Sequence, residues 1–540
     1  MQEQTSLSRI GGARVYLGLL AVVLLLAACA PLPAAQSAPA ASDTSTNSGR
    51  TASDPAAVNA GVAVAPAVVA PAAPPAAPAP VVKAMKLAPE KGSSGSQFVI
   101  NADGLTPGKR VELIWDTAEG SYVTKALPET VEFYEKQFTE KKISLGWATV
   151  DAQGRLSATL NVPDDYGEVH DVYAVSDGQT VARGGYRIMR NITVSPQQGP
   201  VGTPITIKAT GLGYKAYEST LAIRYDNNFM GIVSAVTTGG TATFQIRAAG
   251  RVGKHVIDVD HGAKSVPYLN NQQSGTAHIP DWRFEFTITD DKALPATTFD
   301  WPDKASLNPS SDGVVRTTST QADKTPGFAA RIEPATGPIL SKATLKASGL
   351  QATDQVELYW MSAKGNRVSP SGWSLTEDLM TAVTPDRDGS FKADIQIPDD
   401  LGGWHMVKVV QGDKVLGETP FFVERSLVSA PQRVKAGEIF TIHMKGVGWT
   451  ELDNGVAVTY DNSAIGFACG FNSNGDVTMN LTATGGPGIH LIDLYPMLYQ
   501  GHGKPPWGYQ VPLLSFAQDA PGLALGYNLP VLRLAIEVVD

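Results

Sequence analysis

The segment from His255 to His261 holds the densest group of residues that could do chemistry. It contains two histidines and two aspartates within seven positions, and imidazoles together with carboxylates can bind a metal ion or move protons. The segment also alternates as a β-strand does, which places His255 on one side and both Asp258 and Asp260 on the other. One strand therefore does not close these groups on a single ion, and a metal-dependent hydrolase is kept only as an alternative.

A histidine of the same kind opens an alternating apolar segment at four places in the chain. Each follows a glycine turn, and the four are His170, His255, His405 and His490. A packing feature that occurs once per repeat is a simpler explanation than a catalytic site repeated four times. We therefore predict a structural role for all four, at a corner of the fold.

Two aspartates are the expected partners of two of these histidines. Asp226 and Asp461 each follow a tyrosine and precede an asparagine at the end of a predicted strand. Asp-Asn suits a hairpin turn, because both residues tolerate the left-handed backbone region. In an antiparallel sandwich the end of this strand lies near the start of the histidine strand, so we expect Asp226 to hold His255. The same argument pairs Asp461 with His490.

Paired carboxylates stand at Asp164-Asp165 and Asp399-Asp400, each behind a proline and just before a glycine. Such pairs can serve calcium binding or glycoside hydrolysis, but the setting is that of a loop, and a plain turn is the preferred interpretation. The chain has no EF-hand loop, no His-Glu-x-x-His, no Gly-x-Ser-x-Gly and no Walker motif. We therefore predict no catalytic residue, no metal site and no cofactor.

These residues recur because the chain is a tandem duplication. Gly154 to Asp258 reappears at a constant offset of 235, whereas Trp115 matches Trp360 at 245, so the first half has ten extra residues after Trp115. The offset rises to 250 near the end, which gives the second half fifteen extra residues there. Because a fixed offset leaves no room for net insertion, shared positions mark framework and diverging positions mark loops.

Short alternating runs of β-branched residues, separated by Gly, Pro, Asn and Asp, fill the chain after residue 83, as is typical of antiparallel sandwiches. One segment differs, because Val131, Tyr134 and Phe138 could share a helix face behind Pro128, and we expect a helix over Pro128–Phe138. Repeated entry segments divide the rest into four domains. The predicted order is a signal peptide over 1–28, a disordered Ala/Pro-rich tether over 29–83, domains over 84–190 and 191–292, a linker over 293–326, and domains over 327–425 and 426–540.

The second domain carries the clearest family resemblance. Its opening, Val194 to Ile207 followed by Gly211 to Tyr214, resembles the start of an IPT/TIG domain of the immunoglobulin-like class. The resemblance implies an all-β protein of four tandem immunoglobulin-like β-sandwiches in two duplicated pairs. In such sandwiches a tyrosine often bonds the backbone at the corner before the sixth strand, and we interpret the four histidines as substitutes for it.

Recognition is expected where the two halves diverge, at Asp116 to Trp147, Asp260 to Asp281 and above all Tyr495 to Leu529. The last segment is rich in aromatic side chains among many glycines and prolines, and such rings can stack on sugars or anchor a protein. The alternative is that the loops fold back over a neighbouring domain and bury these rings. The candidate binding residues are Tyr495, Tyr499, His502, Trp507 and Tyr509.

The first residues predict the compartment. Arg9 and Arg14 precede an apolar run from Val15 to Leu26, and Leu26-Ala27-Ala28-Cys29 follows. These four residues resemble the lipobox of bacterial lipoproteins, which implies cleavage before Cys29 and lipidation of its sulfur. The run is shorter than the roughly 20 residues of a spanning helix. The tether that follows would reach on the order of 100 Å from the membrane.

Composition narrows the partners. A net charge of −9 and a pI near 5.5 argue against nucleic acid or an anionic membrane surface as the main partner, since both require basic patches. If Cys29 carries lipid, Cys469 is the one remaining thiol and no internal disulfide is expected. The expected function is non-enzymatic binding or adhesion, to a glycan or an envelope protein, by a membrane-anchored protein of the cell envelope that faces the extracytoplasmic side. A structural spacer of a surface assembly is the second hypothesis.

Overall fold

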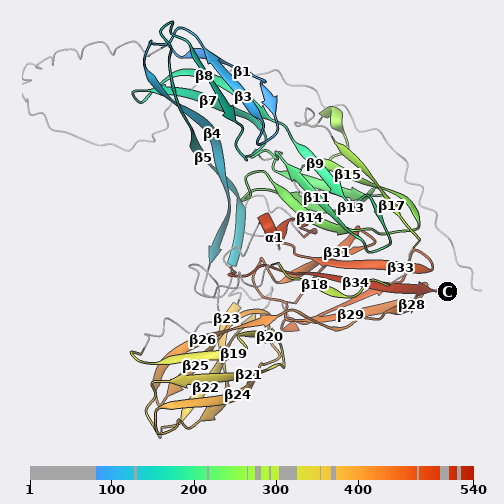
Figure 1. The fold of residues 1–540 in the computed structure, drawn as a ribbon. Helices are drawn as coiled ribbons and strands as arrows, with labels where there is room; N and C mark the ends of the chain where they lie inside the picture. The colour runs from blue at the N-terminus through green and yellow to red at the C-terminus, as the bar shows by residue number, and fades with distance from the viewer. Residues whose placement is uncertain are drawn as a thin grey trace, which may run out of the picture. The chain divides into compact units, whose positions relative to one another are not determined.

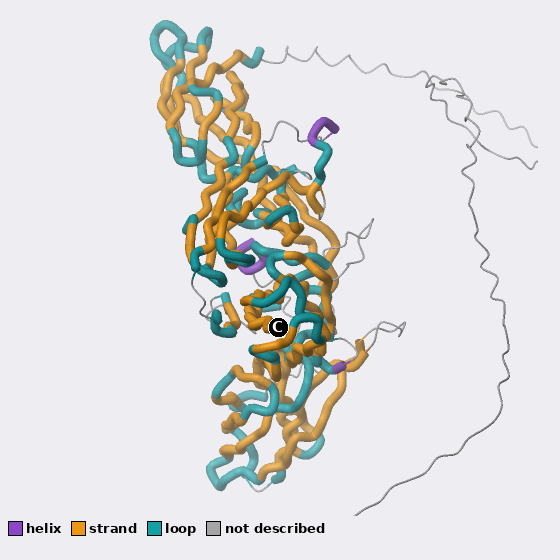
Figure 2. The backbone as a smooth tube through the Cα atoms, turned by 90° about the vertical axis from the view of Figure 1, so that its right-hand side faces the viewer, coloured by secondary structure: helices purple, strands orange, loops and turns teal. Residues whose placement is uncertain are grey.

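We describe the protein from a computed structural model in which residues 78–540 form one unit. The structure describes residues 81–126, 131–215, 218–263, 266–273, 281–290, 294–302, 325–352, 354–365, 373–470, 473–498, 510–519 and 525–540. Almost all regular structure in these residues is β-strand, with one short 3₁₀ turn, η1 (Asn271–Gln273), and one short helix, α1 (Phe516–Asp519) (Figure 2). The prediction of an all-β fold is confirmed.

The first half of the chain builds two sandwiches (Figure 1). The first consists of β1 (Lys83–Ala88), β2 (Lys91–Gly92), β3 (Gln97–Ala102), β4 (Arg110–Ala126), β5 (Val131–Thr149), β6 (Leu156–Asn161), β7 (Glu168–Ser176) and β8 (Gln179–Ile188). The second consists of β9 (Asn191–Ser195), β10 (Gln198–Gly199), β11 (Pro204–Thr210), β12 (Thr220–Tyr225), β13 (Asn228–Ser234), β14 (Ala242–Arg247), β15 (Gly253–Ala263), β16 (Val266–Pro267) and β17 (Trp282–Ile288).

The second half repeats this plan. The third sandwich consists of β19 (Ala329–Glu333), β20 (Thr336–Pro338), β21 (Lys342–Ser348), β22 (Val356–Gly365), β23 (Trp373–Val383), β24 (Ser390–Gln396), β25 (Gly403–Gln411) and β26 (Lys414–Glu424). The fourth consists of β18 (Thr298–Asp300), β27 (Ser426–Ser429), β28 (Arg433–Lys435), β29 (Ile439–Lys445), β30 (Gly455–Tyr460), β31 (Ser463–Cys469), β32 (Val477–Thr482), β33 (Gly488–Tyr495) and β34 (Val531–Val539).

In the second, third and fourth sandwiches a three-stranded sheet faces a larger one. The small sheets are β14-β11-β9, β19-β21-β24 and β27-β29-β32, and the main paths of the large sheets are β10-β17-β15-β12-β13, β20-β26-β25-β22-β23 and β18-β34-β33-β30-β31. In the first sandwich β1 pairs with both β3 and β8, so the two layers join in one eight-stranded sheet with the path β5-β4-β7-β8-β1-β3-β6. Alternating apolar residues from both layers fill the space between them, as in Ile205, Ile207, Ile257 and Val259 of the second sandwich, all fully buried. This alternation is the physical reason for the two-layer architecture.

The helix expected over Pro128–Phe138 is wrong for its described part. Residues from Val131 onward belong to β5, which pairs with β4 over its whole length, with Lys136 opposite Tyr122. The apolar spacing is compatible with a helix, but a long partner strand supplies the backbone hydrogen bonds, and tertiary pairing overrides the local pattern. β4 and β5 form a two-stranded arm that extends beyond the first sandwich (Figure 1).

The segment expected to link the halves contains a strand of the fourth sandwich. β18 pairs antiparallel with β34, with Thr298 opposite Arg533 and Asp300 opposite Val531. The chain therefore passes along the fourth sandwich before it enters the third. Residues 303–324 of the expected linker lie outside the described residues.

The second and fourth sandwiches share a buried contact. Leu491, Tyr495 and Ala535 of the fourth belong to the same apolar cluster as the core of the second. Arg247, at the end of β14, places its guanidinium 2.5 Å from the carboxylate of Asp493 and donates to the carbonyl of Leu534 at 2.6 Å. Both charged side chains are almost fully buried, so each depends on the other.

We predict that Arg247→Ala destabilises the protein by about 3 kcal/mol, because it leaves the buried Asp493 with one cationic partner fewer. Denaturant unfolding of residues 84–540 measures this change. The exposed Lys208→Ala on β11 serves as the matched control and is expected to have little effect. In an Asp493→Asn background the cost of Arg247→Ala should fall clearly; an equal cost in both backgrounds would show that the ion pair is not the cause.

Candidate functional site

The histidines of the first and third sandwiches are buried in backbone contacts. Nδ1 of His170 lies 2.8 Å from the carbonyl of Asp116 and Nε2 lies 2.8 Å from that of Tyr166. The ring stacks on Trp115 with centroids 4.7 Å apart. His405 repeats the arrangement with the carbonyls of Met361 and Leu401, at 2.9 and 2.8 Å, and stacks on Trp360. Both ring nitrogens are occupied by framework contacts.

The histidines of the second and fourth sandwiches meet the aspartates of the hairpin turns. Nδ1 of His255 lies 2.5 Å from Oδ2 of Asp226, whose Oδ1 accepts the Val256 N–H at 2.8 Å. His490 and Asp461 repeat this contact at 2.5 Å. The structure thus brings together the two pairs that the turn geometry predicts.

The turns themselves explain these contacts. Asp226 and Asn227 have φ values of 48° and 67°, and Asp461 and Asn462 have 46° and 62°. Two successive left-handed residues make the tight two-residue hairpin loop that matches strand twist. The turn directs the aspartate side chain towards the first residues of the neighbouring strand, and the histidine is the third residue of that strand.

The carboxylates beside His255 belong to an ionic network on the opposite side of β15. Asp258 accepts Arg283 at 2.8 Å, and Asp260 accepts Arg224 at 2.5 Å. His261 lies 3.0 Å from Asp281. In the part of the chain that the structure describes, no group of three or more His, Cys, Asp or Glu side chains is arranged to hold a metal ion.

The Pro-Asp-Asp motifs have a role that the plain-turn interpretation missed. Asp165 accepts the indole N–H of Trp115 at 2.8 Å and the hydroxyl of Thr117 at 2.8 Å. Asp400 accepts the indole N–H of Trp360 at 2.7 Å. A buried indole N–H requires an acceptor, so the second aspartate of each motif satisfies the central tryptophan of its domain. The available signal was that both the aspartates and the pair Trp115 and Trp360 recur between the two halves.

Of the candidate binding loop, only its ends are described. Tyr495 is 1% exposed, and its hydroxyl accepts Arg533 at 3.2 Å. Tyr499, His502, Trp507 and Tyr509 lie outside the described residues. Residues 510–519 return against the second sandwich, where Leu513 bridges Ile232 in parallel. Both described ends of the segment are therefore fixed in buried contacts.

The arm of the first sandwich and the long segment of the fourth meet at Asp519. Its carboxylate, 1% exposed, accepts the Tyr122 hydroxyl at 2.6 Å, the Ser234 hydroxyl at 2.5 Å and the Thr237 N–H at 2.8 Å. One carboxylate thus connects three sandwiches. Nearby, Lys136 donates to Thr220 at 2.8 Å, and burial lowers the pKa of Lys136 to about 8 against the opposing effect of the Asp519 charge.

An apolar cluster extends this junction to the third sandwich. Phe133, at the far end of the arm, is 2% exposed, and its N–H donates to Glu451 at 2.9 Å. It shares the cluster with Trp404 of the third sandwich and with Trp449 and Tyr527 of the fourth. The divergent segments Asp116 to Trp147 and Tyr495 to Leu529 therefore brace the domains in their described parts.

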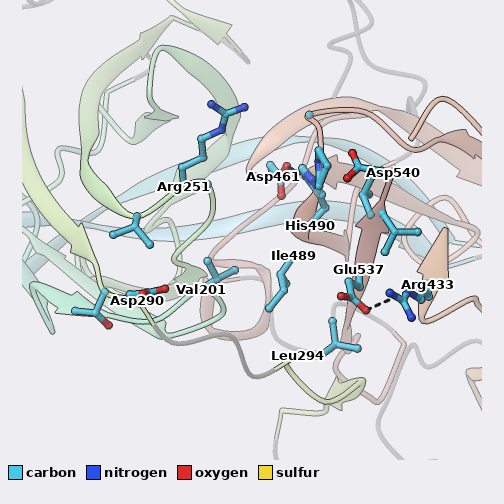
Figure 3. Close-up of a pocket in the computed structure, with 18 residues that line it drawn as sticks. Val201, Arg251, Asp290, Leu294, Arg433, Asp461, Ile489, His490, Glu537 and Asp540 are labelled. Carbon is cyan, nitrogen blue, oxygen red and sulfur yellow. Dashed lines mark hydrogen bonds and ion pairs between the residues drawn. The ribbon is translucent and has the colours of Figure 1, made fainter. Parts of the chain in front are cut away.

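A cleft of about 980 Å³ opens between the second and fourth sandwiches (Figure 3). Its walls include residues 250–252 of the second sandwich and, from the equivalent corner of the fourth, residues 485 and 487–490. Apolar side chains such as Leu294 and Ile489 line it beside Arg251 and Asp290, and Arg433 pairs with Glu537 at 3.5 Å. The Asp461–His490 contact forms part of the wall. Sequence reasoning missed this cleft because two domains far apart in the chain create it.

Comparisons with known proteins add no assignment. No family model matches the chain, and no curated protein matches it. A Salmonella alpha-2-macroglobulin is 10% identical over 83% of this chain and 30% of that chain, with a TM-score of 0.16. A putative membrane anchored protein from Corynebacterium diphtheriae is 12% identical over 63% of this chain and 91% of that chain, and an ICAM-5 D1-D4 ectodomain fragment is 14% identical over 79% and 99%, both at 0.16. At these TM-scores the alignments support no statement about function.

None of the helices in the ranges given above is long and apolar enough to cross a bilayer. Residues 1–80, which contain the lipobox and the tether, lie outside the described residues.

We predict that Asp461→Ala lowers the melting temperature, and that the loss depends on pH. Burial alone would lower the pKa of His490, but the hydrogen bond and charge of Asp461, with the Gly486 carbonyl, raise it above 6.5. A raised histidine pKa stabilises the fold fully below 6.5 and stops doing so as pH rises through the folded value. The difference in melting temperature between wild type and variant should therefore be larger at pH 6 than at pH 9, by calorimetry.

Asp226→Ala is the matched variant in the second sandwich. It should also lower the melting temperature, by a smaller amount, because the Asp226 side chain is 39% exposed against 25% for Asp461. A charged hydrogen bond of this kind contributes about 1.5–3 kcal/mol when it is protected from solvent. Unchanged melting in both variants would rule out the structural corner.

Proposed function

We propose that this chain is a lipid-anchored protein of the cell envelope, facing the extracytoplasmic side, with a non-enzymatic binding or adhesion role towards a glycan or a protein. The cleft between the second and fourth sandwiches is the observation that carries the proposal. Its volume falls in the range of ligand sites, and it combines apolar walls with a few polar groups, as such sites do. The net charge of −9 disfavours nucleic acid as the partner.

The bracing of the domains supports the same role. Adhesion transmits force through the molecule, and Asp519 connects three sandwiches through buried hydrogen bonds. A cleft between two domains keeps its shape only if the domains are held together, which the Arg247–Asp493 contact does. The histidines and aspartates that suggested hydrolysis serve framework contacts, so a hydrolase has no support from their geometry.

Arg251 is the proposed anchor for an anionic or hydrogen-bonding group of the ligand. It lines the cleft, and its guanidinium projects from the turn 250–252 (Figure 3). An arginine fork recognises carboxylates and sugar hydroxyls by several parallel hydrogen bonds. The loop that carries Tyr499, His502, Trp507 and Tyr509 is a second proposed contact surface, because both of its described ends are fixed.

A structural spacer is the second candidate. Its support is the burial of Tyr495, Phe516 and Tyr527, which are at most 5% exposed and which pack on neighbouring strands and domains. Rings used in this way brace domains rather than contact a ligand. The two candidates differ in whether the cleft and the loop bind anything.

We predict that Arg251→Glu weakens binding of residues 84–540 to its ligand about tenfold, the effect of one lost charged contact. Glycan arrays and immobilised envelope polymers measure it, beside a variant in which residues 499–509 are replaced by a Gly/Ser segment of equal length. Lys86→Glu, an exposed charge reversal on β1, is the matched control and should bind as wild type. If the wild type binds none of these ligands, the spacer is the better description.

We predict that Cys29→Ser releases the protein from the membrane fraction of a bacterial host. The lipobox cysteine is the proposed acylation site, and a lipid chain contributes about 0.8 kcal/mol per buried methylene to membrane binding. Incorporation of labelled palmitate into wild type but not into the variant measures the modification directly. Ser37→Ala in the tether leaves the cysteine intact and should stay in the membrane fraction.

A further inference from the structure

Two edge strands of the molecule are equivalent by the duplication. β13 and β31 are related by the 235-residue offset, and both lie at the edge of their large sheets (Figure 1). Each pairs with its neighbour in the same register, with Ile232 opposite Ala222 and Phe467 opposite Ala457. Each pairing also has a register shift at the equivalent place, between Ile223 and Arg224 of β12 and between Val458 and Thr459 of β30. The two backbones therefore present the same groups outward.

The edge of β13 is closed by an extended segment of the same chain. The N–H of Ile232 donates to the carbonyl of Pro512 at 2.9 Å, and the N–H of Leu514 donates to the carbonyl of Ile232 at 2.9 Å. The segment runs parallel to β13. Under this cover Met230 is 0% and Ile232 is 2% exposed. This is strand addition, in which backbone hydrogen bonds hold an extended apolar segment.

Within the described residues, no extended segment covers the equivalent edge of β31 in this way. Because Phe467 has the pairing of Ile232, its N–H and C=O also point away from β30, and within the described ranges no backbone group from another segment bonds them. Ile465 is 49% and Phe467 is 45% exposed, against nearly zero at the two matching positions of β13. The two strands have the same pairing, so the difference in exposure comes from the segment that covers β13.

β31 also lacks the usual protection of an edge. Its sequence, Ser-Ala-Ile-Gly-Phe-Ala-Cys, contains no charge and no proline. Edge strands that stay unpaired normally carry lysines, prolines or other blocking residues. β5 is an example in this chain, with the exposed Lys141 and Lys142 along it. An uncharged edge with two exposed apolar side chains is suited to pairing.

We propose that β31 is a docking strand for an extended, proline-containing apolar segment of a partner protein, which adds in parallel as Val511–Leu514 adds to β13. The covered edge shows that a bulged strand of this type accepts a parallel segment with two hydrogen bonds at one residue. A second copy of the chain is a poorer occupant, because its own segment of this chemistry is held on its own β13. The inference goes beyond the binding role proposed above, since it requires neither the cleft, nor Cys29, nor residues 499–509.

The test uses a peptide with the sequence of residues 510–515, immobilised at high density, and residues 84–540 in solution. Wild type should bind, and the same peptide N-methylated at the position of Leu514 should not, because that N–H makes the bond to the edge strand. The variant Ile465→Glu/Phe467→Glu should bind at least about tenfold more weakly. Ile439→Glu, an exposed apolar position of the same sandwich, is the matched control and should bind as wild type.

Three results would overturn the proposal. One is the absence of peptide binding by wild type. The second is equal binding by the Ile465→Glu/Phe467→Glu variant with unchanged melting temperature, which would place the peptide on β13. The third is a wild-type dimer that this variant converts to a monomer, which would make a second copy the occupant. The variants Arg251→Glu and the 499–509 replacement should retain peptide binding, which separates failure here from failure of the proposed function.

Discussion

The contact between the second and fourth sandwiches is built around one buried carboxylate, that of Asp493. It lies between Arg247 of the second sandwich and Arg533 of the fourth, in a contact sealed by Leu491 and Ala535. Removing a carboxylate from water costs several kcal/mol unless cations and hydrogen bonds replace the water. The two sandwiches supply one arginine each, so the carboxylate is satisfied only while they stay together. The cleft lies between the same two sandwiches, and the segment that covers β13 passes from the fourth to the second.

Duplication has produced two versions of one framework. In the first and third sandwiches a tryptophan fills the core, an aspartate from the Pro-Asp-Asp loop satisfies its N–H, and the corner histidine stacks on it. In the second and fourth a tyrosine takes the equivalent strand position, and its hydroxyl bonds the backbone of Ala249 or Thr484. The aspartate comes from the hairpin turn there, and it bonds the corner histidine. Both versions answer the same physical need, which is to satisfy every polar group at a buried corner. The divergent segments then connect domains that the framework alone would leave separate.

The strands and the hairpin turns of the sandwiches could be predicted from the sequence, because each depends on residues that are close together in the chain. Alternation of apolar residues predicts strands, and Asp-Asn at a strand end predicts both the tight turn and the contact of Asp226 with His255. The helix expected near Phe138 failed because the spacing of three apolar residues fits either structure, and only the partner strand β4 decides between them. Asp519 could not be recognised, since Tyr122 lies 397 residues away in the chain and nothing local marks either residue.

Most of the β-strands, the repeated sandwiches and the corner contacts of the second and fourth sandwiches could be predicted from local patterns, because each depends on residues a few positions apart or on one repeated pattern. Which surfaces remain available depends instead on the packing of distant segments. β13 and β31 have the same register and the same outward backbone groups, yet within the described residues an extended segment covers only β13. The cover is a segment that follows the fourth sandwich's β33, and it reaches β13 because the Arg247–Asp493 contact brings the second sandwich beside it. Whether an edge strand is exposed depends on which distant segment packs against it, and the sequence of the strand itself does not indicate that segment.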